Sequence, residues 1–257
     1  MKIDDVIMEV TTIRDAMSSI ITEPSRHVLT TVIADLISQR DLAIKSPKKT
    51  RKAQKAEKPP WKLVILPETP LSFRNTENEA VIKHRLEVDL ACSLSEPDAK
   101  GIPRGEHNIA VRVWSTDSAL CFREDIDAES LRAPIGIQGR RVMLRFHFDL
   151  ANKDQQGPRH HLQMGGKGMT ADYHWLPDNW KLPRFLHFPV NLALVCEFIG
   201  RTFYPDGFRR ISQEPTWRHA VKAAEEAYVF PFLSALPYIT IDPRRRTDSL
   251  LSSVWNG

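Results

Sequence analysis

The sequence predicts an α+β fold: an antiparallel sheet covered by C-terminal helices, with an N-terminal helical hairpin on a basic linker. Apolar residues recur every three or four positions near both ends of the chain and every second position in the middle. These are the periods of helices and strands, respectively. Strands that precede helices, rather than alternate with them, are typical of α+β proteins.

The N-terminal residues 1–44 are expected to form a helical hairpin. One helix is predicted over residues 3–21, and its apolar positions are Val6, Val10, Ile13, Met17 and Ile20. A second helix begins near Pro24, which is tolerated in a first turn because its missing N–H would be unpaired there. Both apolar stripes must be buried. They can pack on each other, on the main domain, or on a homo-oligomer or partner that contacts residues 3–43.

A basic linker is predicted over residues 45–60, because this stretch has no aliphatic side chain larger than alanine. Within it, residues 45–58 hold seven lysines and arginines against the single acid Glu57, a net charge of +6 in a chain of net +4. The rest of the chain is therefore slightly acidic. The linker is either a solvated tether or a contact for nucleic acid or an acidic partner protein.

The main α+β domain is expected over residues 61–243, followed by a C-terminal tail over 244–257. Strands are predicted at 81–94, 108–115 and 141–150, where apolar and polar residues alternate, at 159–164 as the return strand after 141–150, and at 63–66, a short apolar run closed by Pro67. This alternation is typical of an antiparallel sheet with one solvated face. Helices are predicted over 189–203 and from Pro215 to about Pro231, and these cover the other face.

Several classes of protein are excluded by composition and motifs. No run of about 18 apolar residues is present, so no membrane helix is expected. The acidic N-terminus is unlike a secretory signal, which predicts a soluble, cytoplasmic protein. The three cysteines are far apart and lack CxxC spacing, which argues against a disulfide framework or a thiolate zinc site. No GxSxG or dinucleotide-binding motif occurs, and no cofactor is assigned.

The hairpin over residues 145–166 carries the strongest candidate site. The side chains of Arg145, His147 and Asp149 point to one face of the outgoing strand. On the return strand either His161 and Gln163 or His160 and Leu162 share that face. Because Leu162 is apolar, we expect it in the core, which places His161 and Gln163 beside His147 and Asp149.

Such a cluster suits phosphodiester cleavage, with one histidine as the base, the other as the acid, and Arg145 stabilising the phosphorane. Asp149 completes the catalytic set. Three further residues are expected to bind the substrate: Gln163, Arg112 and Lys167, the last in a glycine-rich turn. The alternatives are a divalent metal held by His147, Asp149 and His161, although the sequence assigns no metal, or a solvated face whose charges pair with each other.

A resemblance adds a biological setting. The segments FHFDLANKDQQGPRHHLQMGG and LPRFLHFPVNLALVCEFIGRTFYP resemble bacterial proteins carried on mobile elements. The strand–loop–HH part is also similar to the RFDNxPHH segment of TumE-like toxins, although His160 and His161 are followed here by Leu162 and Gln163. The resemblance implies a toxin or anti-phage defence component that acts on RNA. The alternative is a non-catalytic module that binds a partner protein or nucleic acid.

Overall fold

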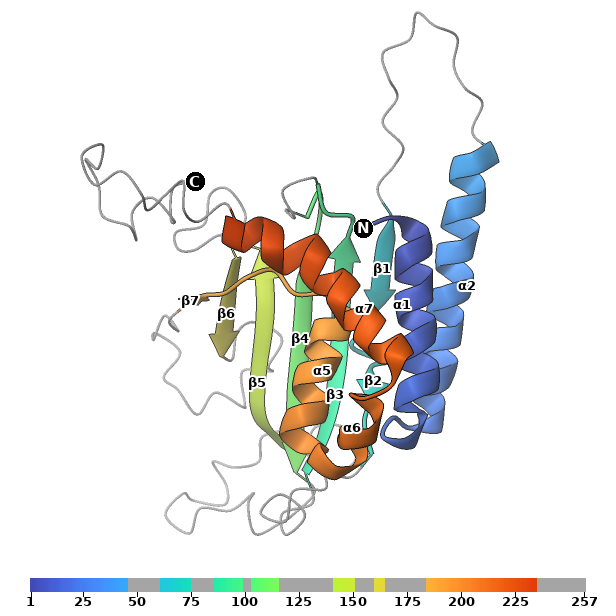
Figure 1. Ribbon diagram of the computed structural model, residues 1–257. Helices are drawn as coiled ribbons and strands as arrows, with labels where there is room; N and C mark the ends of the chain where they lie inside the picture. The colour runs from blue at the N-terminus through green and yellow to red at the C-terminus, as the bar shows by residue number, and fades with distance from the viewer. Residues whose placement is uncertain are drawn as a thin grey trace, which may run out of the picture.

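The computed structural model describes residues 1–45, 61–74, 86–98, 103–115, 141–150, 160–164 and 184–234. Its centre is one antiparallel sheet with the strand order β1-β3-β4-β5-β6-β7, and a short β2 pairs with β3 beside β1 (Figure 1). The strands are β1 Lys62–Ile65, β2 Leu71–Ser72, β3 Leu86–Ser95, β4 Asn108–Ser115, β5 Arg141–Leu150, β6 His160–Met164 and β7 Arg184–Leu186. The predicted α+β fold is therefore confirmed.

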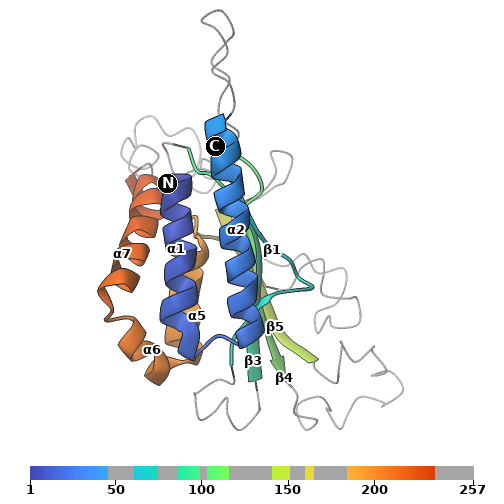
Figure 2. The same ribbon diagram turned by 90° about the vertical axis from the view of Figure 1, so that its right-hand side faces the viewer.

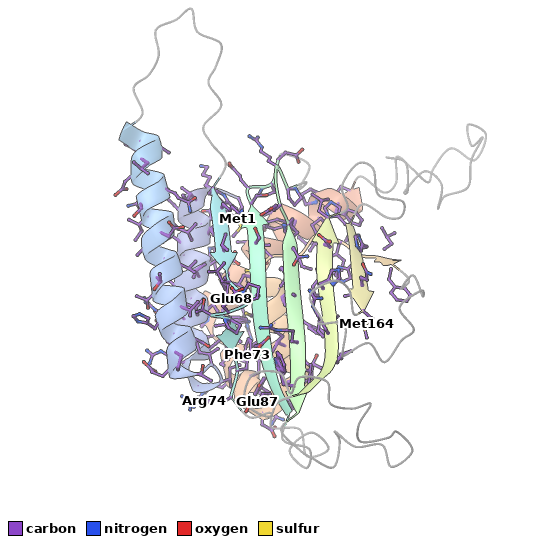
Figure 3. The ribbon with its side chains drawn as sticks, turned by 180° about the vertical axis from the view of Figure 1, so that it is seen from behind. Met1, Glu68, Phe73, Arg74, Glu87 and Met164 are labelled. Carbon is purple, nitrogen blue, oxygen red and sulfur yellow. The ribbon has the colours of Figure 1, made fainter. Side chains whose placement is uncertain are left out.

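The helices form a layer on one face of the sheet and at its β1 edge (Figure 2). The N-terminal hairpin consists of α1 Ile3–Ala16 and α2 Glu23–Lys45, joined by the short 3-10 turn Met17–Ser19. The C-terminal helices are α5 Leu192–Phe203, α6 Pro205–Ile211 and α7 Pro215–Ala224. No helix of the described residues lies over the opposite face of the sheet (Figure 3).

One hydrophobic core joins the hairpin to the sheet. The α1 side chains Val10 and Ile13 are fully buried, and they belong to the same cluster as Leu90 and Val111 of the sheet and Val195 of α5. The amphipathic stripe of the hairpin is thus buried against the main domain, as one of the sequence-based alternatives allowed. Across the described residues, no helix combines the length and apolarity that crossing a membrane requires.

The strands with strong alternation were predicted well. The bounds of β4 and β5 equal the predicted ranges, and β6, described over His160–Met164, lies within the predicted range 159–164. Three short elements were missed: β2, β7 and α6. They are too short to show a period of their own, so only their neighbours in space define them.

The predicted stop of the last helix near Pro231 is wrong. Helical structure continues to residue 234. A π-helical turn over Glu225–Val229 precedes the proline. In a π-turn the N–H groups bond five residues back, so the hydrogen-bond ladder is already displaced where Pro231 has no N–H to contribute.

Candidate functional site

The register of β5 and β6 brings the predicted residues together. Asp149 is the Cα partner of His161, and His147 is the partner of Gln163. This is the register that the apolar character of Leu162 predicted, and Leu162 indeed packs against the core. The prediction that His161, rather than His160, lies beside His147 and Asp149 is confirmed.

Aromatic packing on the helix side holds this register. Phe146 lies edge-on to Phe198 of α5 at 5.6 Å between ring centroids, and Phe148 lies 4.8 Å from His187. His160 also faces the helices, where its ring is 5.8 Å from Phe232. A slip of one residue would exchange this apolar set for charged side chains, so the burial of the aromatics fixes which side chains face the other way.

The three polar residues on the far face form a close group. One ligand atom from each of His147, Asp149 and His161 lies within 4.8 Å of the other two. The imidazole rings of His147 and His161 meet edge-on, with centroids 6.4 Å apart and an interplanar angle of 71°. Two imidazole nitrogens and a carboxylate oxygen within this distance can exchange a proton or share a metal ion.

The cluster is more enclosed than the sequence suggested. His147 is 7 % exposed and His161 only 1 %, whereas Asp149 is half-buried. The expectation of a solvent-washed sheet face is therefore wrong at these two histidines. Cross-strand neighbours contribute to this, because side chains that face each other across strands only ~4.8 Å apart cover one another.

Arg145 lies beside the cluster on the same face. Its Cα partner on β4 is Arg112. Burial lowers the pKa of Arg145, and the charge of Arg112 lowers it further. A guanidinium beside the cluster can bind an anion such as a phosphate.

Arg112 itself is engaged inside the sheet. Its Nε and Nη2 donate to Asp89 at 2.6 and 3.1 Å, and Nη2 also donates to the Pro67 carbonyl. Trp114 Nε1 donates to the same carboxylate at 2.8 Å. Asp89 is 4 % exposed, so Arg112 is paired with a buried carboxylate. The predicted substrate-binding role of Arg112 would thus require a substrate to share the guanidinium with Asp89.

The other predicted binding residues divide into two groups. Gln163 lies next to the cluster, opposite His147. Lys167 and its glycine-rich turn lie outside the described residues, as do the tail 244–257 and all but the first residue of the basic segment 45–58.

A second polar group in the core was not predicted. Glu9 of α1 is buried, and it accepts hydrogen bonds from Asn191 Nδ2 at 2.8 Å and from the Ala193 N–H at 3.0 Å. Burial raises the pKa of Glu9 to about 8, although both hydrogen bonds act in the opposite direction. Nearby, His107 Nε2 donates to the Val190 carbonyl at 2.6 Å, and burial lowers the pKa of His107 to about 4.

One sequence signal pointed to this group. Asn191 directly precedes α5, whose start was predicted three residues too early at 189, and its Oδ1 caps the helix by accepting from the Leu194 N–H at 3.1 Å. Glu9 lies three residues after Val6 and four before Ile13, so helical spacing places it at the α1 stripe, although its charge argued against burial. Only the packing of α5 against α1 brings the two side chains together.

An apolar cavity of about 390 Å³ lies on the helix side of the same strands. Its lining includes Phe146, Phe148, Leu162, Leu194 and Phe198. The cavity is therefore separated from His147, Asp149 and His161 by the backbone of β5 and β6, and it does not form part of the polar cluster.

Compared with protein-family models, with curated proteins and with solved structures, the chain shows no match in any of the three comparisons. The interpretation of the site consequently depends on its own geometry.

Proposed function

We propose that the protein cleaves phosphodiester bonds of RNA at the face of β5 and β6 that carries His147, Asp149 and His161. The observation that supports this most is the register, which sets a carboxylate directly opposite one imidazole and close to a second. Paired histidines can deliver and remove the protons that phosphodiester cleavage moves. A metal ion held by the same atoms is the other chemistry available to this set.

Arg145 is proposed to bind the scissile phosphate. Strand residues two positions apart lie on one face about 6.6 Å from each other, so Arg145 is one step from His147 along β5. A guanidinium can stabilise the extra negative charge of the phosphorane. Gln163, opposite His147, is in a position to donate to a phosphate or a base.

The proposed biological setting is a toxin or an anti-phage defence component. Its support is the similarity of the segment around His160 and His161 to TumE-like toxins, which is an analogy of sequence. Induced expression is then expected to slow bacterial growth, and Asp149→Asn is expected to relieve the effect.

The direct test uses purified protein and a fluorescent single-stranded RNA. We expect the wild type to cleave it, and His147→Ala and Asp149→Asn to lower the rate by about 100-fold or more, as loss of a positioned acid or base does. His219→Ala is the matched control, since this histidine is exposed on α7. A folded wild-type protein that is inert toward RNA, both with and without added divalent metal, would refute the proposal.

A second candidate is a non-catalytic binding module that holds nucleic acid or an acidic protein. It is favoured by the end of α2, where Leu42 and Ile44 are 68 % and 70 % exposed directly before the basic segment. Exposed apolar side chains beside positive charge are typical of a contact surface. Deletion of residues 45–58 is expected to weaken a complex recovered by pull-down, and an unchanged complex would exclude this role for the segment.

A further inference from the structure

The proposed function leaves open how the cluster activates its nucleophile. As whole residues, His147 and His161 are 7 % and 1 % exposed. A general acid or base must reach a proton of the substrate directly or through one water. At these exposures the imidazoles would act on the substrate through a water or through an ion that they hold, and burial is no obstacle to holding a small ion.

The donor set has the composition of a transition-metal site. Two imidazole nitrogens and one carboxylate oxygen suit zinc, iron, manganese or cobalt, whereas magnesium and calcium prefer ligands that are all oxygen. Three protein ligands also leave coordination positions for water or substrate, as in catalytic rather than structural zinc sites.

The spacing of the donor atoms fits one ion. Nitrogen and oxygen ligands bind zinc at about 2.0–2.2 Å, which places ligand atoms about 3.4 Å from one another in a tetrahedral site. In the structure the three donor atoms lie within 4.8 Å of one another. The register of the two hydrogen-bonded strands fixes the backbone positions of His147, Asp149 and His161. Small rotations of their side chains are then enough to bring the donor atoms from within 4.8 Å to about 3.4 Å of one another.

The residues around His147, Asp149 and His161 also favour a metal-binding site. On β4, Asn108 is the Cα partner of Asp149, so an amide stands beside the carboxylate on the side away from His161. Groups of this kind commonly orient metal-binding side chains. Asp149 is the one charged residue of the set, so a bound divalent ion would keep a net positive charge, which together with Arg145 favours an anionic substrate.

We propose that His147, Asp149 and His161 bind one divalent transition-metal ion, with zinc as the representative case. For its chemical consequence this inference rests on the proposed function, since the ion would then activate the nucleophile in place of the imidazoles. Binding of the ion itself does not require any activity.

The test is a titration of metal-free, full-length protein with Zn²⁺ by calorimetry, and with Co²⁺ by visible absorption. We expect one ion per chain and a visible absorption spectrum typical of Co²⁺ with a low coordination number. We also expect a higher melting temperature of the protein with Zn²⁺ than without it. Asp149→Asn and His161→Ala are expected to weaken binding by about tenfold or more. His160→Ala is the matched control, because it removes a buried histidine of the same strand from the opposite face.

Asp149→Asn is nearly isosteric, and its circular dichroism and melting temperature without metal report whether it folds. Absence of Zn²⁺ binding by the wild type, or equal binding by the wild type and folded Asp149→Asn, would overturn the inference. If the wild type binds Zn²⁺ but leaves RNA intact, the metal site stands and the proposed function fails. If metal-free protein cleaves RNA at the full rate, the proposed function stands and the ion has no part in activating the nucleophile, while the Zn²⁺ titration alone decides whether the site binds metal.

Discussion

Glu9 and Asn191 are 182 positions apart in the chain, yet their side chains meet in the core at 2.8 Å. The carboxyl group also accepts from the Ala193 N–H in the first turn of α5. Both oxygens of Glu9 therefore satisfy donors at the start of this helix. The contact ties α1 to α5, the helix whose Phe198 packs on Phe146 behind the polar cluster.

The raised pKa of Glu9 predicts a specific dependence of stability on pH. Burial raises this pKa from its ordinary 4.5 to about 8. The stabilising contribution is complete below pH 4.5, where the group is protonated in both states. It is lost as the pH rises toward 8, at up to about 1.4 kcal/mol per pH unit, because only the unfolded chain ionises in this range.

Glu9→Gln tests this dependence, because glutamine cannot ionise. We expect the free energy of unfolding of the wild type to fall more between pH 5 and pH 8.5 than that of the variant. At pH 5 the variant should be less stable by about 1 kcal/mol, since one of the two accepted hydrogen bonds is lost. Urea unfolding at both pH values gives the comparison, and parallel pH profiles for the two proteins would show that Glu9 is already ionised in the folded state.

The buried ion pair of Asp89 with Arg112 predicts a large effect of Asp89→Asn. The carboxylate is 4 % exposed and accepts from Arg112 and Trp114. Substitution leaves the guanidinium partly buried without its counter-charge, which is expected to cost about 3 kcal/mol or more.

The matched control is Glu106→Gln, which breaks the ion pair of Glu106 with Lys62, whose side chains are 70 % and 51 % exposed. We expect no measurable change in melting temperature, because water and salt screen such pairs. Equal effects of the two substitutions in thermal unfolding would contradict the assignment of Asp89 to a buried network.

Gly200 is predicted to be required where α5 meets α6. A Cβ atom at this position would overlap three carbons of the Phe208 ring, which is 1 % exposed and lies edge-on to Trp217 at 5.5 Å. The ring has no room to move, so Gly200→Ala is expected to destabilise the fold by about 1–3 kcal/mol.

Gly105→Ala provides the comparison for Gly200→Ala. Its added Cβ would meet Ser95 Oγ at 3.3 Å and Ser95 Cβ at 3.4 Å, and because Gly105 is itself exposed, a shift of a few tenths of an ångström is enough. Chemical unfolding should show a clear loss for Gly200→Ala and little change for Gly105→Ala. A neutral Gly200→Ala would mean that the two helices are less tightly packed than described.

The elements that could be predicted from the sequence were those in which apolar residues recur with a regular period. The alternation over residues 141–150 gave both the bounds of β5 and the face of His147 and Asp149. The apolar Leu162 then selected the register, because an incorrect register would have exposed it. Local sequence could not reveal the enclosure of His161. Helical spacing places Glu9 at the buried stripe of α1, but its partners Asn191 and Ala193 belong to a segment far away in the chain and could not be predicted.

The measurement that tests the central claim most directly compares RNA cleavage by His161→Ala and His160→Ala at equal folded fraction. The two histidines are adjacent and both buried, but only His161 shares a face with Asp149. We predict that His161→Ala lowers the cleavage rate constant by about 100-fold or more, whereas His160→Ala retains a rate close to that of the wild type. Equal rates for the two variants, or a greater loss for His160→Ala, would contradict the account.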